Sequence, residues 1–150
     1  MIPRPPSPSL VVDANIILSI ASGLRARPVL ERVLAHRAVL TSARARQEAL
    51  GRAGDLRDGS EQAVASAVAA LNMVTVIESE MYASLVEMAG ESLRYAAASR
   101  NGSTRDAHLL ALAWITDSDL WTHDRDFAGT GWPTWSSHNL MAVLINISGN

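Results

Sequence analysis

Short runs of Val, Ile, Leu and Trp recur along the chain, separated by longer stretches of mixed polarity. Runs of this length are too short for helices and are typical of buried strands. Four of them predict strands over Leu10–Val12, Ala38–Thr41, Val74–Ile77 and Leu120–Thr122. Pro133–Ser136 predicts a fifth strand at the edge of the same sheet.

Between these runs the apolar positions follow helical spacing or the composition favours helix. The evidence for helices is the spacing of Leu30, Val33 and Leu34, that of Ala107, Leu110, Ala111 and Trp114, and the composition of Glu61–Leu71, Met81–Ala98 and His138–Ile147. Asp55–Ser60 and Arg100–Ser103 are predicted loops. Strands that alternate with helices predict an α/β fold with a mainly parallel sheet covered on both faces.

The length of 150 residues and the 48% apolar content suit one domain, which we place at residues 10–150. Residues 1–9, rich in Pro and Ser, are predicted to form a flexible tail. No run of about 18 uncharged apolar residues is present, and the N-terminus lacks the apolar segment of a secretory signal. We therefore expect a cytoplasmic protein without membrane contact.

The chain contains no Cys, which excludes disulfides, thiolate zinc sites and cysteine nucleophiles. A formal net charge of −2 argues against a protein that coats polyanions with its whole surface. All 13 basic residues are Arg, a side chain that binds phosphate with two parallel hydrogen bonds. Any metal must therefore be held by oxygen or imidazole ligands, and carboxylates are the leading candidates.

Four acidic residues from distant parts of the chain map to one edge of the predicted sheet. Asp13 ends the first strand, and Asp124 follows the strand Leu120–Thr122. Glu48 lies about two turns into a helix predicted to begin near Ser42, and Asp106 opens the helix that leads into the fourth strand. In open parallel sheets, ligands bind at the carboxyl ends of the strands, where these acids should meet.

Each acid taken alone has a structural explanation. An Asp after a strand is a common turn residue, Ser103-x-x-Asp106 matches a capping box, and Glu48 fits a solvated helix face. Taken together, carboxylates at one site repel one another unless a cation neutralises them. Mg²⁺ or Mn²⁺ is the natural counter-charge because both prefer oxygen ligands and can activate water for attack on phosphorus.

Four segments in this order resemble the acidic motifs of the PIN-domain nucleases. The segments are Val11–Asn15, the helix with Glu48, Arg105–Ala111 and Trp121–Phe127, and the resemblance spans Leu10 to Trp135. It implies a Rossmann-like three-layer α/β/α fold and a Mg²⁺- or Mn²⁺-dependent endoribonuclease. It also implies, as one form of that activity, the toxin of a VapBC-type pair, with RNA as substrate, an antitoxin partner and a homodimer.

The resemblance also assigns roles to single residues. It makes Asp13 and Asp106 the principal metal ligands, Glu48 and Asp124 further ligands directly or through water, and Asn15 and Thr122 neighbours that orient them. The fourth acid is either Asp124 or Asp126, and we favour Asp124 because it lies nearer the strand end. Gly129–Trp135 is similar to a tail found in some members, without an assigned role.

Other side chains were weighed as substrate contacts or core residues. Arg44, Arg46 and Arg105 lie near the acidic motifs and suit phosphate binding, although a solvated charged face also explains such residues. We expect structural roles for His108 and His123. Of the tryptophans, only Trp132 and Trp135 are expected at the surface, where they could stack on bases.

Two other α/β protein classes that use strand-end carboxylates are disfavoured. A phosphoacceptor receiver domain needs a Lys near its last strand, and the chain has none. A haloacid-dehalogenase-type phosphatase needs a second Asp where Asn15 stands. A non-catalytic PIN-like module that binds protein or RNA remains the alternative to a nuclease.

Overall fold

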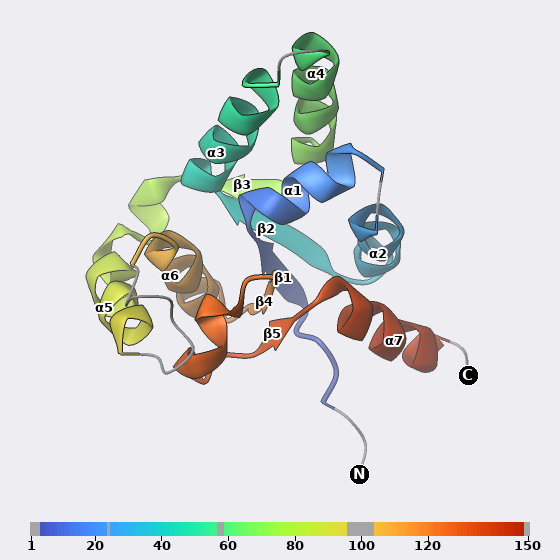
Figure 1. The fold of residues 1–150 in the computed structure, drawn as a ribbon. Coiled ribbons are helices and arrows are strands. Elements are labelled where there is room, and N and C mark those ends of the chain that lie inside the picture. Colours follow the sequence, from blue (N-terminus) through green and yellow to red (C-terminus); the bar gives the residue numbers. More distant parts are fainter. Residues whose placement is uncertain (1–3, 24, 57–58, 96–103, 149–150) are drawn as a thin grey trace.

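The computed structural model describes residues 4–23, 25–56, 59–95 and 104–148, which form a five-stranded, all-parallel sheet with helices on both faces (Figure 1). The strand order is β3-β2-β1-β4-β5. The strands are β1 (Ser9–Val12), β2 (Ala38–Ser42), β3 (Thr75–Ile77), β4 (Asp119–Trp121) and β5 (Thr134–Trp135). The predicted α/β fold with a parallel sheet is confirmed, and β5 takes the predicted place at the edge.

The helices largely follow the predicted segments. They are α1 (Ala14–Ala21), α2 (Ala26–Leu34), α3 (Ala43–Gly54), α4 (Ser60–Leu71), α5 (Ala83–Arg94), α6 (Ala107–Thr116) and α7 (Ser137–Ser148), with short 3-10 helices η1 (Ser79–Met81) and η2 (Arg125–Thr130). Within the described ranges, no helix is long and apolar enough to span a membrane. The end of the predicted helix Met81–Ala98 and the predicted loop Arg100–Ser103 lie outside the described residues.

Both faces of the sheet are buried, which explains why its strands are continuous apolar runs. Leu10 and Val12 of β1 join the core that α1, α2 and α7 cover, whereas Val11 points into the core under α5 and α6. Figure 1 shows these two groups of helices on opposite sides of the sheet, with α3 and α4 projecting away together. The three layers place every helix–strand junction on one of two edges.

The register of β1 fixes what lies beside Asp13. Val12 pairs with Trp121 of β4, so the next residues of the two strands, Asp13 and Thr122, emerge side by side. On the other flank Val11 pairs with Leu40 of β2. The carboxyl edge of the sheet therefore brings together residues more than 100 positions apart in the sequence.

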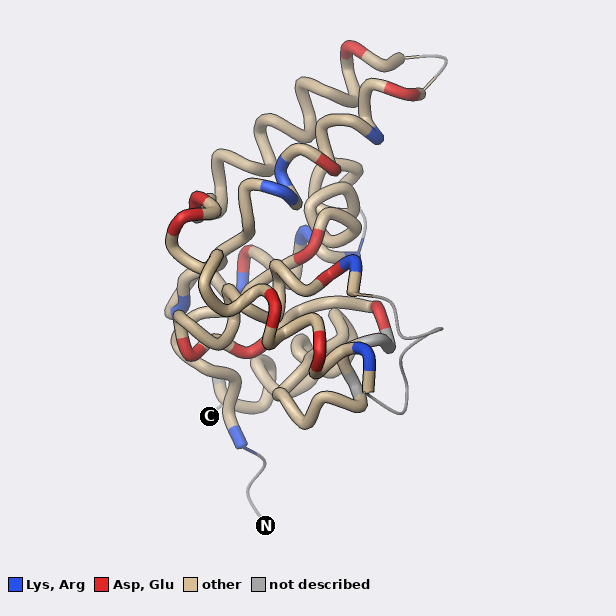
Figure 2. Tube along the Cα trace, turned by 90° about the vertical axis from the view of Figure 1, so that its left-hand side faces the viewer, with Lys and Arg blue, Asp and Glu red and all other residues tan. Residues whose placement is uncertain are grey.

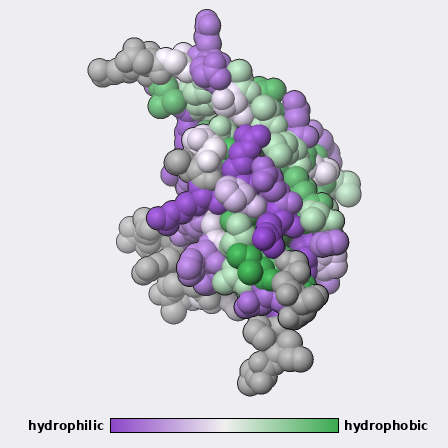
Figure 3. Space-filling model, turned by 90° about the vertical axis from the view of Figure 1, so that its right-hand side faces the viewer, coloured by the Kyte–Doolittle hydropathy of each residue, from purple (hydrophilic) through white to green (hydrophobic). Residues whose placement is uncertain are grey.

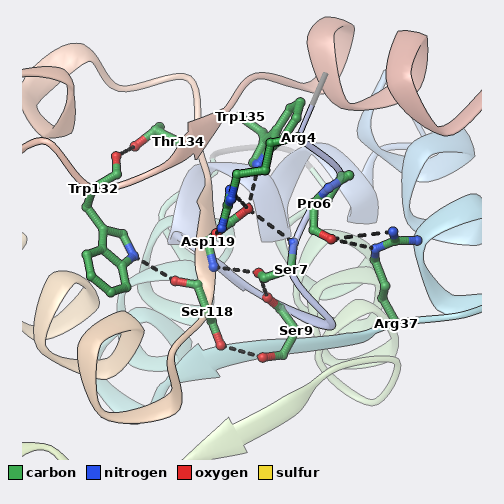
Figure 4. Close-up of polar contacts among 10 residues, drawn as sticks. All are labelled: Arg4, Pro6, Ser7, Ser9, Arg37, Ser118, Asp119, Trp132, Thr134 and Trp135. Atoms are coloured by element: carbon green, nitrogen blue, oxygen red, sulfur yellow. Dashed lines mark hydrogen bonds and ion pairs between the residues drawn. The ribbon is translucent and has the colours of Figure 1, made fainter. Parts of the chain in front are cut away.

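At the opposite, amino-terminal edge, the first residues of the chain are bonded to β4 (Figure 4). Asp119, which is 2% exposed, receives hydrogen bonds from the guanidinium of Arg4 at 3.0 and 3.1 Å and from the backbone N–H of Ser7 at 3.1 Å. The Ser7 hydroxyl in turn accepts from the Asp119 N–H at 2.7 Å. The expected flexible tail over residues 1–9 thus needs correction, since residues 4–9 pack on the sheet; residues 1–3 lie outside the described part.

The tryptophans of the Gly129–Trp135 segment also bind β4 (Figure 4). The indole N–H of Trp132 donates to the backbone oxygen of Ser118 at 2.7 Å, and that of Trp135 donates to Asp119 at 2.8 Å. Both residues are only partly exposed. The expectation of two surface aromatics is therefore wrong, because their polar ends point inward and hold the segment against the sheet.

Candidate metal centre

Asp13 sits where β1 gives way to α1 and is 9% exposed. One carboxylate oxygen accepts a hydrogen bond from the Ile16 N–H at 2.9 Å, which caps the helix. Burial raises the pKa of Asp13, while the hydrogen bonds from Thr122 and Ile16 act in the opposite direction. A buried carboxylate with no described basic partner is a costly group that favours a cation nearby.

Thr122 connects Asp13 to the loop that carries Asp124. Its hydroxyl donates to the second carboxylate oxygen of Asp13 at 2.5 Å and accepts from the Asp124 N–H at 3.0 Å. The hydroxyl proton is thereby committed to Asp13, and the orientation of that carboxylate is fixed by contacts from β4 and α1. The β1–β4 register is the reason that Thr122 can make both bonds.

Asp106 immediately precedes α6 and faces the other acids. Burial raises its pKa to about 6, and three neighbouring carboxylates contribute in the same direction. In decreasing order of effect these are Asp124, Asp13 and Glu48, and a side-chain hydrogen bond with Asp124 adds to the shift. The mutual effect on pKa shows that the four acids share one electrostatic environment.

The capping explanation of Asp106 has little support from its geometry. Asp106 occupies the position before the first helical residue, but its side chain makes no capping hydrogen bond. Ser103, the other half of the predicted capping box, lies outside the described residues. The burial and charge environment of Asp106 therefore have no explanation in helix capping.

Several acidic positions from separate segments gather in the body of the molecule, away from the projecting α3–α4 pair (Figure 2). The donors near Asp13 are all oxygens, which suits Mg²⁺ or Mn²⁺ rather than a soft metal. Among the described residues, no three His, Asp or Glu side chains are close enough to hold one ion together. The donor chemistry fits a hard cation, and the side chains would have to draw together around it.

His108 of α6 is a buried residue behind this site. Its Nδ1 lies 2.7 Å from the hydroxyl of Ser42, which also caps α3 through the Ala45 N–H. Burial, with a smaller effect from the charge of Arg44, lowers the pKa of His108 to about 4. The neutral imidazole thus joins α6 to the start of the helix that carries Glu48.

The comparisons with known proteins decide the family. A profile described as the PIN domain matches residues 11–145, which is most of the chain. The chain belongs to the PIN-domain family. No curated protein sequence matches it.

Solved structures show the same fold as this PIN domain. VapC20 from Mycobacterium tuberculosis, described as a sarcin-ricin loop cleaving toxin, matches with a TM-score of 0.59 and 24% identity over 82% of this chain and 95% of that chain. VapBC2 from Rickettsia felis, solved with a DNA fragment from their promoter, matches with 0.61 and 13% over 85% and 98%. PAE2754 from Pyrobaculum aerophilum matches with 0.61 and 17% over 95% and 90%.

The other residues singled out in the sequence occupy varied positions in the PIN domain. Asn15 is exposed, and its amide oxygen accepts a hydrogen bond from Arg52. Arg44 pairs with Glu48 at 3.5 Å, and Arg46 pairs with Glu78 at 3.6 Å. These contacts show that Arg44 reaches the acidic site, whereas Arg46 is directed toward a carboxylate outside it.

Arg105 is exposed and neighbours Asp106 in the sequence. The choice between Asp124 and Asp126 is informed from one side only, because the side chain of Asp126 lies outside the described residues. Asp124 influences the pKa of both Asp13 and Asp106. Asp124 therefore stays our choice for the fourth acid.

One feature of the PIN domain escaped the sequence analysis. A cleft of about 530 Å³ lies beside the acidic site and includes Arg25, His123, Ser137 and His138. His123 belongs to both regions, because its charge lowers the pKa of Asp13. These residues come from α2, the β4 loop and α7, so no local motif marks them.

Proposed function

We propose that this PIN domain is a divalent-metal-dependent endoribonuclease that hydrolyses RNA phosphodiester bonds. The observation that carries the proposal is the crowding of carboxylates, expressed in the pKa of about 6 at Asp106. Such a shift is typical of functional sites, where charged groups are assembled at a cost to stability. The PIN family and the likeness to VapC20 support RNA as the substrate class.

In this proposal Asp13 and Asp106 hold Mg²⁺ or Mn²⁺, and Glu48 and Asp124 complete the site directly or through water. The bound ion supplies positive charge to the developing transition state and activates the attacking water. The chain itself supplies orientation. Thr122 and the Ile16 N–H fix the Asp13 carboxylate, and the Arg44 guanidinium limits the freedom of Glu48.

The test is cleavage of a 5′-labelled RNA by the purified chain in MgCl₂ or MnCl₂, with EDTA as the control. We expect cleavage with either metal and none in EDTA. Attack by water, rather than by the RNA 2′-hydroxyl, predicts products without a 2′,3′-cyclic phosphate. Cleavage that persists in EDTA, or that leaves cyclic phosphates, would refute the metal-activated water.

A pair of Asp→Asn variants separates the acidic site from a general loss of charge. Asp106→Asn should lower the cleavage rate by about a hundredfold or more, as expected when a metal site loses a ligand. Asp55→Asn removes an equal charge from the exposed end of α3 and should cleave like the wild type. Equal rates for both variants would contradict the assignment of Asp106.

A toxin of the VapBC type is the specific form of this function that we propose. The likeness to VapC20 and to VapBC2 supports it, together with an antitoxin partner and a homodimer. The alternative is a PIN module that binds RNA or protein without catalysis, and the lack of a three-residue metal group among the described residues is the observation in its favour. RNA binding without cleavage in either metal would favour that alternative.

A further inference from the structure

Two clefts between α2 and α7 form one groove that starts at the acidic site. The first, about 530 Å³, includes Arg25 and His123 and meets the second, about 560 Å³, at Pro28 and Met141, which line both. Each volume falls in the range typical of small-ligand sites, roughly 300 to 1,000 Å³. The groove therefore has room for several linked units of a polymer.

The groove carries positive charge on a chain whose formal net charge is −2. Arg25 lines the first cleft, and Arg32 and Arg37 line the second, against a single acid, Glu31. The Arg37 guanidinium donates to the backbone oxygen of Pro6 at 3.4 Å, a neutral acceptor that leaves its charge in place. The local charge is thus opposite to that of the whole chain and complementary to a polyanion.

Apolar surface lies between these polar groups. Val29 is buried in the core below the groove, and Pro28 and Met141 face it from α2 and α7. Figure 3 views the side of the molecule that carries these helices and shows apolar surface bordered by hydrophilic side chains. A floor on which bases can rest and a basic rim for phosphates are the two elements of single-stranded nucleic-acid sites.

The end of the groove nearest the acids is held in place by hydrogen bonds. Trp121 Nε1–H donates to the Ser137 hydroxyl at 3.0 Å, so that hydroxyl directs its own proton to Nε2 of His123 at 2.8 Å. The Ser137 N–H also points to Nε2, at 3.4 Å. Neutral His123 therefore carries its proton on Nδ1, which has no hydrogen-bond partner among the described residues.

We propose that the α2–α7 groove binds the RNA strand on one side of the scissile bond, with Arg25 contacting a backbone phosphate and the floor at Pro28 and Met141 receiving a base. The proposal rests on the proposed function for the choice of RNA. The path of the strand follows from His123, which borders both the groove and Asp13. The groove thereby positions the substrate, while the carboxylates do the chemistry.

The test measures binding separately from cleavage, with a fluorescein-labelled 12-nucleotide RNA in EDTA at several salt concentrations. Arg25→Gln should weaken binding about tenfold, as for a lost charge-assisted contact, and reduce the salt slope by about 0.7 per phosphate contact. Arg27→Gln removes the same charge from an exposed position of α2 outside both clefts and is the matched control. Glu31→Gln should tighten binding.

Equal losses for Arg25→Gln and Arg27→Gln would overturn the proposal, as would a wild-type chain that does not bind the RNA. An RNA with 4-thiouridine should crosslink to the peptide that contains Ser136 and Met141, and crosslinks only elsewhere would also overturn it. If AMP binds with a dependence on Arg25 while RNA affinity does not change, the site takes free nucleotides and the strand proposal fails. Cleavage without dependence on the groove refutes the groove alone, and groove binding without cleavage refutes the proposed nuclease alone.

Discussion

Replacing Asp106 by Asn should stabilise the metal-free protein, which is the opposite of what an ordinary helix cap would show. The carboxyl of Asp106 has a pKa of about 6 in the folded chain, against an ordinary value of 3.8. Each unit of difference is worth about 1.4 kcal/mol, which gives an upper limit of about 3 kcal/mol. Because part of the side chain is exposed and solvent screens it, we expect about 1 to 2 kcal/mol.

The pH dependence of this effect has a definite sign. Since folding raises the pKa of Asp106, the folded state holds the proton more tightly than the unfolded chain between pH 3.8 and about 6. The contribution of Asp106 to stability is fully favourable below pH 3.8 and is lost as the pH rises through about 6. Asp106→Asn should therefore exceed the wild type in stability at pH 8, and the difference should shrink toward pH 4.

Urea unfolding in EDTA at pH 8 and pH 4.5 measures both parts of this prediction. A gain of 1 to 2 kcal/mol corresponds to a rise in Tm of roughly 2 to 8 °C for a domain of this size. Adding MgCl₂ should stabilise the wild type more than the variant, since the wild type keeps the ligand. A variant that is less stable than the wild type at pH 8 in EDTA would refute the crowding argument and favour the capping explanation.

Three further predictions follow from the geometry. Asp124→Ala should slow single-turnover RNA cleavage much more than Asp126→Ala, because Asp124 interacts with Asp13 and Asp106; the reverse order would contradict our choice of the fourth acid. Asp117→Gly should raise the urea-measured free energy of unfolding by roughly 0.5 to 1 kcal/mol, because Asp117 has a φ of 51°, where glycine is unstrained. Arg4→Ala should lower that free energy by about 1 kcal/mol at pH 7, and the loss should fade in acid as Asp119 becomes protonated.

The sign of the last effect follows from the environment of Asp119. Burial by itself would raise the pKa of this carboxyl, but hydrogen bonds from Arg4, Trp135 and the Ser7 N–H outweigh it and hold the pKa below its ordinary value. The stability that these bonds provide is therefore present above pH 3.8 and lost as the pH falls through the lowered pKa. A stability loss in Arg4→Ala that is equally large at pH 3 would contradict this account.

The strands and most helices were predictable because their signal is local. Each strand of the parallel sheet is buried on both faces and shows in the sequence as a continuous apolar run, as Leu10, Val11 and Val12 do. Helix α1 was not singled out, since Ala14, Ile16, Ile17 and Ile20 are all buried and leave no amphipathic stripe. The N-terminal segment was misjudged because its partner, Asp119, lies 112 residues from Ser7.

By itself, the sequence determined the α/β class, the order of the acidic motifs and the oxygen-only chemistry of any metal site, because these depend on residue type and local spacing. Only the tertiary structure decided which side chains meet. The β1–β4 register set Thr122 beside Asp13, and the packing of α7 on α2 placed Arg25, His123 and Met141 in one groove. Such contacts depend on strand pairing and helix packing between distant segments, which leave no periodic trace in the chain.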